Sequence, residues 1–347
     1  MRTHHQLEQV NPTKRRGRGC LVWLGGIVAV FVGLMLLGAG YEAVAEAADV
    51  RAYPPPGQLV DVGGYRLHIN CVGTGSPTVV IDSGQADWSA TWSSWVQPDV
   101  AKTTRVCTYD RAGLGWSEPG PLPHTAEHFA QELHTLLDHA HIPGPYVLVG
   151  HSMGGLTVRV FVHEYAAEVA GVVLIESMHP SQATPSASAT PRQATPSASA
   201  TPPQATAPAS GLSIATFPAR IGVLRVLAGP LDLKAGLSPE VANAYVAYWA
   251  TPRFIQTYID ESKGMGESLA QAGAITSFGT VPLIVLSRGQ DQEQEWQAMQ
   301  TDLLQLSSQS QQLIADRSGH KVQLDQPEAA VGAIVQMVEQ VRGQAEQ

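Results

Sequence analysis

The feature of the sequence that most constrains the fold is a glycine-rich turn between an apolar run and a helical pattern. The run at residues 146–149 leads directly into Gly150-His151-Ser152-Met153-Gly154-Gly155, and apolar side chains at a helical spacing follow over residues 156–163. A strand that passes into a helix through one tight turn exposes the residue at the apex, and side chains at Gly150 and Gly154 would collide there. The pattern predicts an exposed, reactive Ser152 on a strained turn.

A second constraint is the uncharged stretch of residues 20–41, which is about long enough to cross a bilayer as a helix. Basic residues precede it, namely Lys14, Arg15, Arg16 and Arg18. By the positive-inside rule, we expect residues 1–19 to stay in the cytoplasm and the remaining residues to lie outside a single-pass cell-membrane anchor. Small residues at 43, 45 and 47 leave the alternative of a cleaved signal peptide and a secreted protein, although the apolar stretch is longer than usual for one.

Charge and motif content exclude several classes of partner. The 347 residues carry a net charge of −9. Residues 1–40 contain five Lys or Arg and one Glu, whereas the rest of the chain contains 16 basic and 29 acidic residues. An acidic exported part is a poor partner for nucleic acid. No His or Cys spacing resembles a zinc signature and no dinucleotide fingerprint occurs, so we predict neither a metal nor an organic cofactor. Nothing in the sequence indicates the oligomeric state.

Strand-like and helix-like runs alternate through most of the chain. Residues 58–62 and 65–72 are predicted to form a hairpin across Gly63-Gly64. Further short apolar strands are predicted at residues 78–81, 105–109, 146–149, 171–175, 282–287 and 312–315. Thr125 is predicted to cap the helix that follows it. This alternation is typical of a mostly parallel sheet that is covered by helices on both faces.

Three segments depart from the alternation. Residues 42–57 end in a proline run and are predicted to form a Pro-rich spacer. Residues 181–210 contain QATPSASATP twice, starting at residues 182 and 193, and have no apolar surface for a core, so they are predicted to be a disordered repeat loop that glycosylation could modify. Residues 211–279 are predicted to be helical without strands.

From about residue 58 to residue 341, apart from the repeat loop, the sequence resembles the α/β-hydrolase fold family, in particular its serine esterases and lipases. Four motifs carry the resemblance in the family's order: Asp82-Ser83-Gly84-Gln85, residues 109–117 (YDRAGLGWS), residues 150–155, and Ser318-Gly319-His320. The resemblance implies an α/β fold with a mostly parallel eight-stranded sheet and a helical cap, residues 211–279, inserted after the sixth strand. The hydrolase core would then comprise residues 58–180 and 280–347.

The same resemblance implies a catalytic triad and an oxyanion hole. Ser152 would be the nucleophile, and His320, in a glycine-containing loop after the last strand, would be its general base. The backbone N–H groups of Met153 and Gln85 would form the oxyanion hole. This sequence has Ser-Gly before Gln85 where the family more often has His-Gly, which leaves the backbone donors in place.

Two carboxylates compete for the acidic position of the triad. Glu176 ends the sixth predicted strand, a position that some members of the family use. Asp291 follows the seventh predicted strand, where most members carry the acid, but the residues around it are typical of a helix N-cap. We favour Glu176 and keep Asp291 as the alternative.

The resemblance also implies that two cysteines of the exported part could form a disulfide. The family's strand order places the second and fourth strands side by side, which would bring Cys71 and Cys107 within bonding range. A disulfide is permitted in an oxidising compartment. Two buried free thiols are the alternative.

These features together predict a membrane-anchored, extracytoplasmic serine hydrolase. It would cleave a small ester or a related acyl compound through an acyl-Ser152 intermediate. The alternatives are a carbon–carbon bond hydrolase or a peptidase on the same triad, or a non-catalytic binding protein that retains the hydrolase fold.

Overall fold

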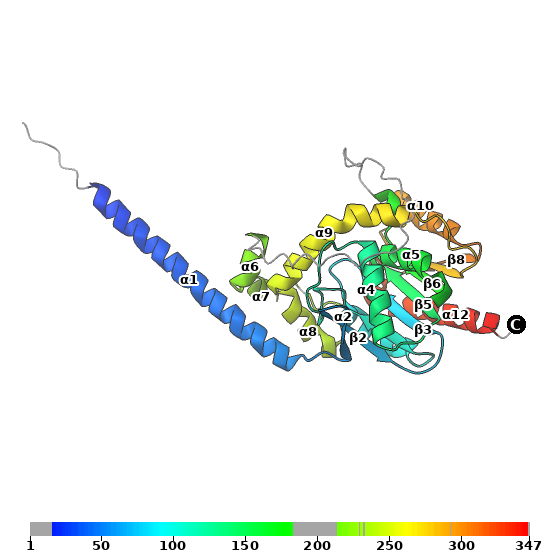
Figure 1. The fold of residues 1–347 in the computed structure, drawn as a ribbon. Coiled ribbons are helices and arrows are strands. Elements are labelled where there is room, and N and C mark those ends of the chain that lie inside the picture. The colour runs from blue at the N-terminus through cyan, green and yellow to red at the C-terminus, as the bar shows by residue number, and fades with distance from the viewer. Residues whose placement is uncertain (1–15, 183–213, 229, 232, 292, 346–347) are drawn as a thin grey trace, which may run out of the picture.

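The computed structural model describes residues 16–182, 214–228, 230–231, 233–291 and 293–345 (Figure 1). Nearly all of the predicted repeat loop and most of the predicted cytoplasmic segment lie outside the described residues. An eight-stranded sheet with the order β1-β2-β4-β3-β5-β6-β7-β8 organises the described part. The strands are β1 Gln58–Asp61, β2 Arg66–Val72, β3 Thr78–Asp82, β4 Val106–Tyr109, β5 Tyr146–His151, β6 Val169–Ile175, β7 Leu283–Arg288 and β8 Ser310–Ala315.

The sheet is parallel except at one end. Strand β2 runs antiparallel to both β1 and β4, and every other pair of neighbours is parallel. The β1–β2 hairpin closes across Gly63 and Gly64, both of which have positive φ, as the sequence predicted. The mostly parallel sheet expected from the alternating pattern is confirmed.

Helices cover both faces of the sheet, whereas α1 extends away from it (Figure 1). The helices of the described residues are α1 Arg16–Ala52, α2 Ser89–Ser93, α3 Val96–Val100, α4 Ala126–His139, α5 Gly154–Glu164, α6 Phe217–Arg220, α7 Val223–Ala228, α8 Pro239–Trp249, α9 Pro252–Gly273, α10 Gln294–Asp302, α11 Val322–Asp325 and α12 Pro327–Ala345. Short 3₁₀ turns connect several of them. Thr125 caps α4 by accepting a hydrogen bond from the N–H of His128.

The alternation of side chains along the strands divides the core into two layers. Val79 and Val147 point to the layer that α3 and α12 cover. Their neighbours Val80 and Leu148 point to the opposite layer, which α4 and α5 cover. Central strands that are buried on both faces must be apolar throughout, which explains the continuous apolar runs in the sequence.

Cys71 and Cys107 lie opposite each other in the antiparallel pairing of β2 with β4. Their Cα atoms are 4.0 Å apart and their sulfur atoms form a disulfide. The bond joins two neighbouring strands at the antiparallel end of the sheet.

Helix α1 is longer than the predicted membrane segment. It continues through Ala52, so residues 42–52 of the predicted spacer are helical and only residues 53–57 precede β1 without helical structure. The part from Leu21 to Ala52 has a mean hydropathy of 2.5 in its most apolar window and none of that window is buried. By length and composition, α1 is a candidate membrane span.

The described part of the predicted cap is helical, and its last helix has two roles. The first half of α9 lies with α8 over the loops at the carboxyl ends of the strands, where Phe254 packs on Trp88. The second half packs on α4 and α5, and Leu269 and Ala272 belong to the main core. The end of α9 is therefore part of the helical layer over the sheet.

Candidate active site

Ser152 occupies the turn that joins β5 to α5. Its φ is +52°, in the left-handed region that non-glycine residues rarely adopt. A Cβ atom on Gly154 would lie 2.4 Å from the carbonyl oxygen of Asp82, and one on Gly150 would lie 2.7 Å from the Cα of Gly155. The strand–turn–helix expected from the sequence is confirmed, and the two glycines allow the backbone to close it.

His320 lies in the loop between β8 and α11, and its side chain is 40% exposed. Its Nδ1 is 3.3 Å from Oε2 of Glu176. The loop is tied to the turn at Ser152, because Nε2 of the adjacent His151 lies 2.9 Å from the carbonyl oxygen of His320. The structure thus brings together the loop after the last strand, the end of β6 and the turn after β5.

Glu176 directly follows β6 and is fully buried. Its Oε1 accepts hydrogen bonds from the backbone N–H of Arg288 at 2.8 Å and from Nε1 of Trp296 at 3.1 Å. Its Oε2 faces His320 and lies 3.6 Å from Nε of Arg288. The two donors on Oε1 hold the carboxylate in one orientation and leave Oε2 for the imidazole.

Asp291, the alternative acid, has a different environment. It is exposed, has a φ of +50°, and makes no hydrogen bond to His320 in the described part of the structure. The expectation that Asp291 is a helix N-cap is wrong, because its backbone is left-handed and an N-cap residue is extended. Helix α10 begins at Gln294 and the residue at its N-cap is Glu293.

His151 is buried beside the site and is uncharged. Burial, followed by repulsion from His320, lowers the pKa of His151 to about 3. Its ring lies 4.9 Å from that of His320 and packs edge-on against Trp92. A neutral, buried His151 positions the loop of His320 and is not suited to accept the proton of Ser152.

The loop after β3 is held against the Ser152 turn by a buried arginine. Arg111 binds the side chain of Asp82 at 2.6 Å and the carbonyl oxygens of Ser83 at 2.6 Å and Gly84 at 2.5 Å. Its Nε donates to Glu261 of α9 at 3.0 Å. Burial disfavours the charge, but Glu261 and Asp82 raise the pKa of Arg111 above its usual value, so the guanidinium stays charged.

The same loop carries one of the two expected oxyanion donors. A Cβ atom on Gly84 would lie 3.2 Å from the Cβ of Ser152, so the backbone before Gln85 runs directly beside the nucleophile turn. Among the residues that the structure describes, the N–H groups of Gln85 and Met153 donate to no loop or side-chain acceptor. Met153 and Gln85 remain the expected oxyanion donors.

Three residues of the site could not be predicted from motifs, because they come from distant segments. Arg288 and Trp296 hold Glu176, and Glu261 binds both Arg111 and, at 2.7 Å, the backbone N–H of Ala86. The sequence contains one indication that Glu261 is paired. It lies seven residues after Phe254 on the apolar face of a helix, where an unpaired charge would be costly.

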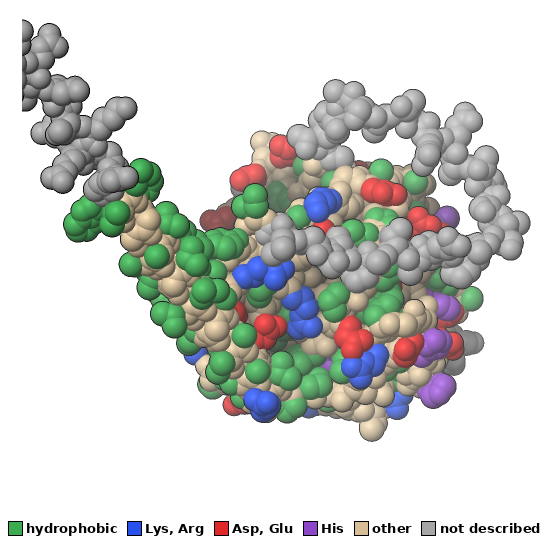
Figure 2. All heavy atoms as spheres, turned by 60° about the vertical axis from the view of Figure 1, so that its left-hand side comes forward, with side chains coloured by type: hydrophobic (Ala, Val, Ile, Leu, Met, Phe, Trp, Pro, Cys, Tyr) green, Lys and Arg blue, Asp and Glu red, His purple; other side chains and the backbone are tan. Residues whose placement is uncertain are grey.

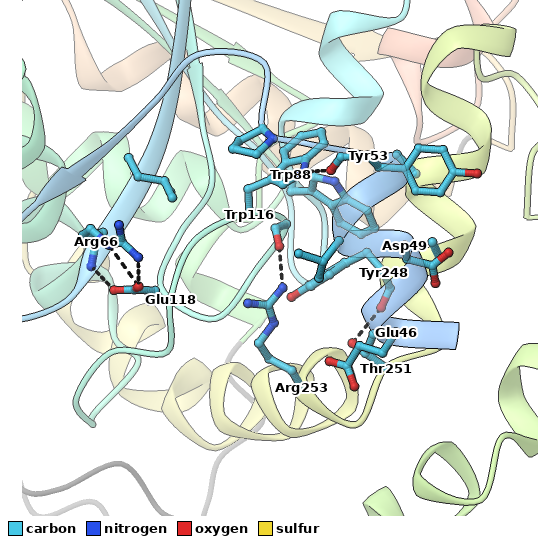
Figure 3. A pocket seen from close by; sticks show the side chains of 16 residues that line it. Glu46, Asp49, Tyr53, Arg66, Trp88, Trp116, Glu118, Tyr248, Thr251 and Arg253 are labelled. Carbon is cyan, nitrogen blue, oxygen red and sulfur yellow. Dashed lines mark hydrogen bonds and ion pairs between the residues drawn. The ribbon is translucent and has the colours of Figure 1, made fainter. Parts of the chain in front are cut away.

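A cavity of about 270 Å³ lies to one side of this site, where the end of α1 meets the cap and the core. Figure 3 shows Trp88, Trp116 and Tyr248 in its walls, with Glu46 and Asp49 of α1 at its edge. Ser152 and His320 do not line it. Trp116 donates a hydrogen bond to the carbonyl oxygen of Tyr53 at 2.9 Å, which ties the segment after α1 to the core.

Comparisons with known proteins agree with the architecture. The chain is 35% identical to the probable transporter efuK of Hormonema carpetanum over 127 residues, which cover 34% of this chain and 18% of that protein. It thus spans less than a third of the length of the first curated relatives that it matches. It is 25% identical to the uncharacterized protein YqjL of Bacillus subtilis over 74% of this chain and 81% of that protein.

A solved structure shows the same fold over most of the chain. A thermophilic esterase from Thermogutta terrifontis superposes with a TM-score of 0.56 and 21% identity, covering 82% of this chain and 98% of the esterase. A sequence model of the alpha/beta hydrolase fold matches residues 77–327, which include the turn at Ser152 and the loop of His320. The chain therefore belongs to the α/β hydrolase fold family.

Proposed function

We propose that this protein is a membrane-anchored, extracytoplasmic serine hydrolase that cleaves an ester or a related acyl compound. The observation that carries the proposal is the contact of His320 with a buried, oriented Glu176, next to a serine on a left-handed turn. A non-catalytic binding protein has no need for a buried carboxylate that is directed at an imidazole. The membrane part of the proposal rests on the length and hydropathy of α1.

The mechanism follows from the roles of these groups. His320 removes the proton from the hydroxyl of Ser152 as the oxygen attacks the acyl carbon, and Glu176 stabilises the imidazolium that forms. The N–H groups of Met153 and Gln85 stabilise the negative charge that develops on the acyl oxygen. His320 then protonates the leaving alcohol, the acyl group stays on Ser152, and water that is activated by His320 releases the acid and regenerates the serine.

Hydrolysis of p-nitrophenyl esters of rising acyl length by the full-length protein in detergent tests the proposal. We expect measurable turnover that the Ser152→Ala substitution abolishes. Ser277→Ala serves as a matched control, because Ser277 is an exposed serine outside the site, and it should leave turnover unchanged. Full activity in the Ser152→Ala variant would contradict the proposal.

The proposed orientation is tested separately with protease added to intact cells. The hydrolase domain that follows α1 should be digested without lysis. Protection until the cells are lysed would place this domain in the cytoplasm.

A further inference from the structure

The cap presents an apolar surface to solvent close to α1. This surface, which we call the α6–α7 face, consists of Phe217, Val223, Val226, Leu227 and Leu231. The side chain of Val226 is 69% exposed and that of Leu231 is 55% exposed. Apolar side chains that gather on one surface, in contrast to scattered ones, mark a contact with a partner or a membrane.

The α6–α7 face adjoins the end of the predicted membrane span. The turn between α6 and α7 packs on α1 so closely that a Cβ atom on Gly38 would lie 2.5 Å from the carbonyl oxygen of Ile221. One on Gly222 would lie 3.0 Å from the ring of Tyr41. Because the uncharged stretch ends at Tyr41 and a helix rises 1.5 Å per residue, the turn lies at the boundary between hydrocarbon and headgroups.

Ion pairs fix this arrangement. Arg225 of α7 donates to both oxygens of the buried Glu42 at 2.9 Å and to Asp49 at 2.5 Å. With its guanidinium bound to α1, α7 cannot rotate freely, so Val226 and Leu227 stay on the outside. Figure 2 shows hydrophobic side chains along α1 that continue to the body of the protein, where both basic and acidic side chains lie near the junction.

We propose that the α6–α7 face is embedded in the lipid leaflet nearest to the catalytic domain. The proposal rests on the proposed membrane anchor. The contact is apolar and not electrostatic, because the sequence after residue 40 is acidic. Interfacial helices can bind in this way, with the apolar face among the acyl chains.

Spin labels on the full-length protein in phosphatidylcholine vesicles test the membrane contact. Cys20 is first replaced by Ala, since Cys71 and Cys107 are joined, and a nitroxide is then attached to Val226→Cys or, as a control, to Ala270→Cys. Ala270 is exposed on the part of α9 that covers the core. We expect the label at 226 to collide more with oxygen than with a water-soluble nickel chelate, and the label at 270 to show the reverse.

Two outcomes at position 226 would overturn the membrane contact. Greater access to the nickel chelate would place the face in water. Poor access to both reagents would show that protein, either another segment of this chain or a second copy, covers it.

Discussion

Replacing Glu176 with glutamine tests which of Glu176 and Asp291 is the acid of the triad, and the expected loss of kcat can be calculated. The Oε1 position receives the N–H of Arg288 and Nε1 of Trp296, which both require an acceptor, so the amide oxygen of glutamine must take that place. The NH₂ group then takes the place of Oε2 and faces Nδ1 of His320, 3.3 Å away. An NH₂ group can only donate, so it selects the tautomer of His320 that carries its proton on Nε2.

A protonated Nε2 cannot accept the proton of Ser152, and no carboxylate remains to stabilise an imidazolium. In serine hydrolases the change from acid to amide at this position lowers kcat by about 10⁴-fold. At 1.36 kcal/mol for each factor of ten, this is about 5.4 kcal/mol of transition-state stabilisation. We expect a loss of this order for Glu176→Gln, with little change in KM.

Steady-state hydrolysis of a p-nitrophenyl ester measures the effect, with circular dichroism to show that the variant is folded. Asp291→Asn is the matched control, because it makes the same chemical change at an exposed residue. It should retain near-normal kcat, because among the described residues Glu176, and not Asp291, is hydrogen-bonded to His320. A loss of kcat in Asp291→Asn with near-normal turnover in Glu176→Gln would assign the acid to Asp291.

Two further predictions concern stability. Desolvation raises the pKa of Asp87 from 3.8 to about 6, so the folded protein binds this proton more tightly than the unfolded chain and stability falls as pH rises through that range. Asp87→Asn removes this titration and should therefore flatten the decline of the free energy of unfolding between pH 4 and pH 8, as urea denaturation at both pH values would show; an unchanged decline would contradict this. Replacing both Cys71 and Cys107 by Ala opens a loop of 36 residues and should lower the free energy of unfolding by about 4 kcal/mol, and a loss below ~1 kcal/mol would contradict it.

The parts of the fold that depend on local patterns could be predicted from the sequence. The turn at Ser152, the β1–β2 hairpin and the cap at Thr125 each need only a few adjacent residues, and the structure has all three. The end of α1 could not be placed in this way, because Glu42 and Glu46 end the uncharged stretch. Helix α1 continues past them, and Arg225 of the cap pairs with Glu42. A pairing between residues this far apart in the sequence leaves no pattern near residue 42.

The same distinction applies to the candidate site. Motif order pointed to Ser152 and His320, but the preference for Glu176 depended on a helix cap at Asp291 that the structure does not contain. What distinguishes the two carboxylates is burial and the donors from Arg288 and Trp296, which lie more than 100 residues from Glu176 in the sequence. Glu261 likewise reaches Arg111 from 150 residues away. Long-range pairing of buried charges is fixed by the fold and cannot be derived from one sequence.

Covalent modification by a fluorophosphonate, which reacts with an activated serine, tests most directly whether Ser152 is the nucleophile. The full-length protein in detergent is labelled, digested and mapped by mass spectrometry. We expect one adduct, on Ser152, that is lost in Ser152→Ala, after denaturation, and largely in Glu176→Gln. An adduct on another serine, or undiminished labelling of the Ser152→Ala variant, would contradict the assignment of Ser152 as the nucleophile.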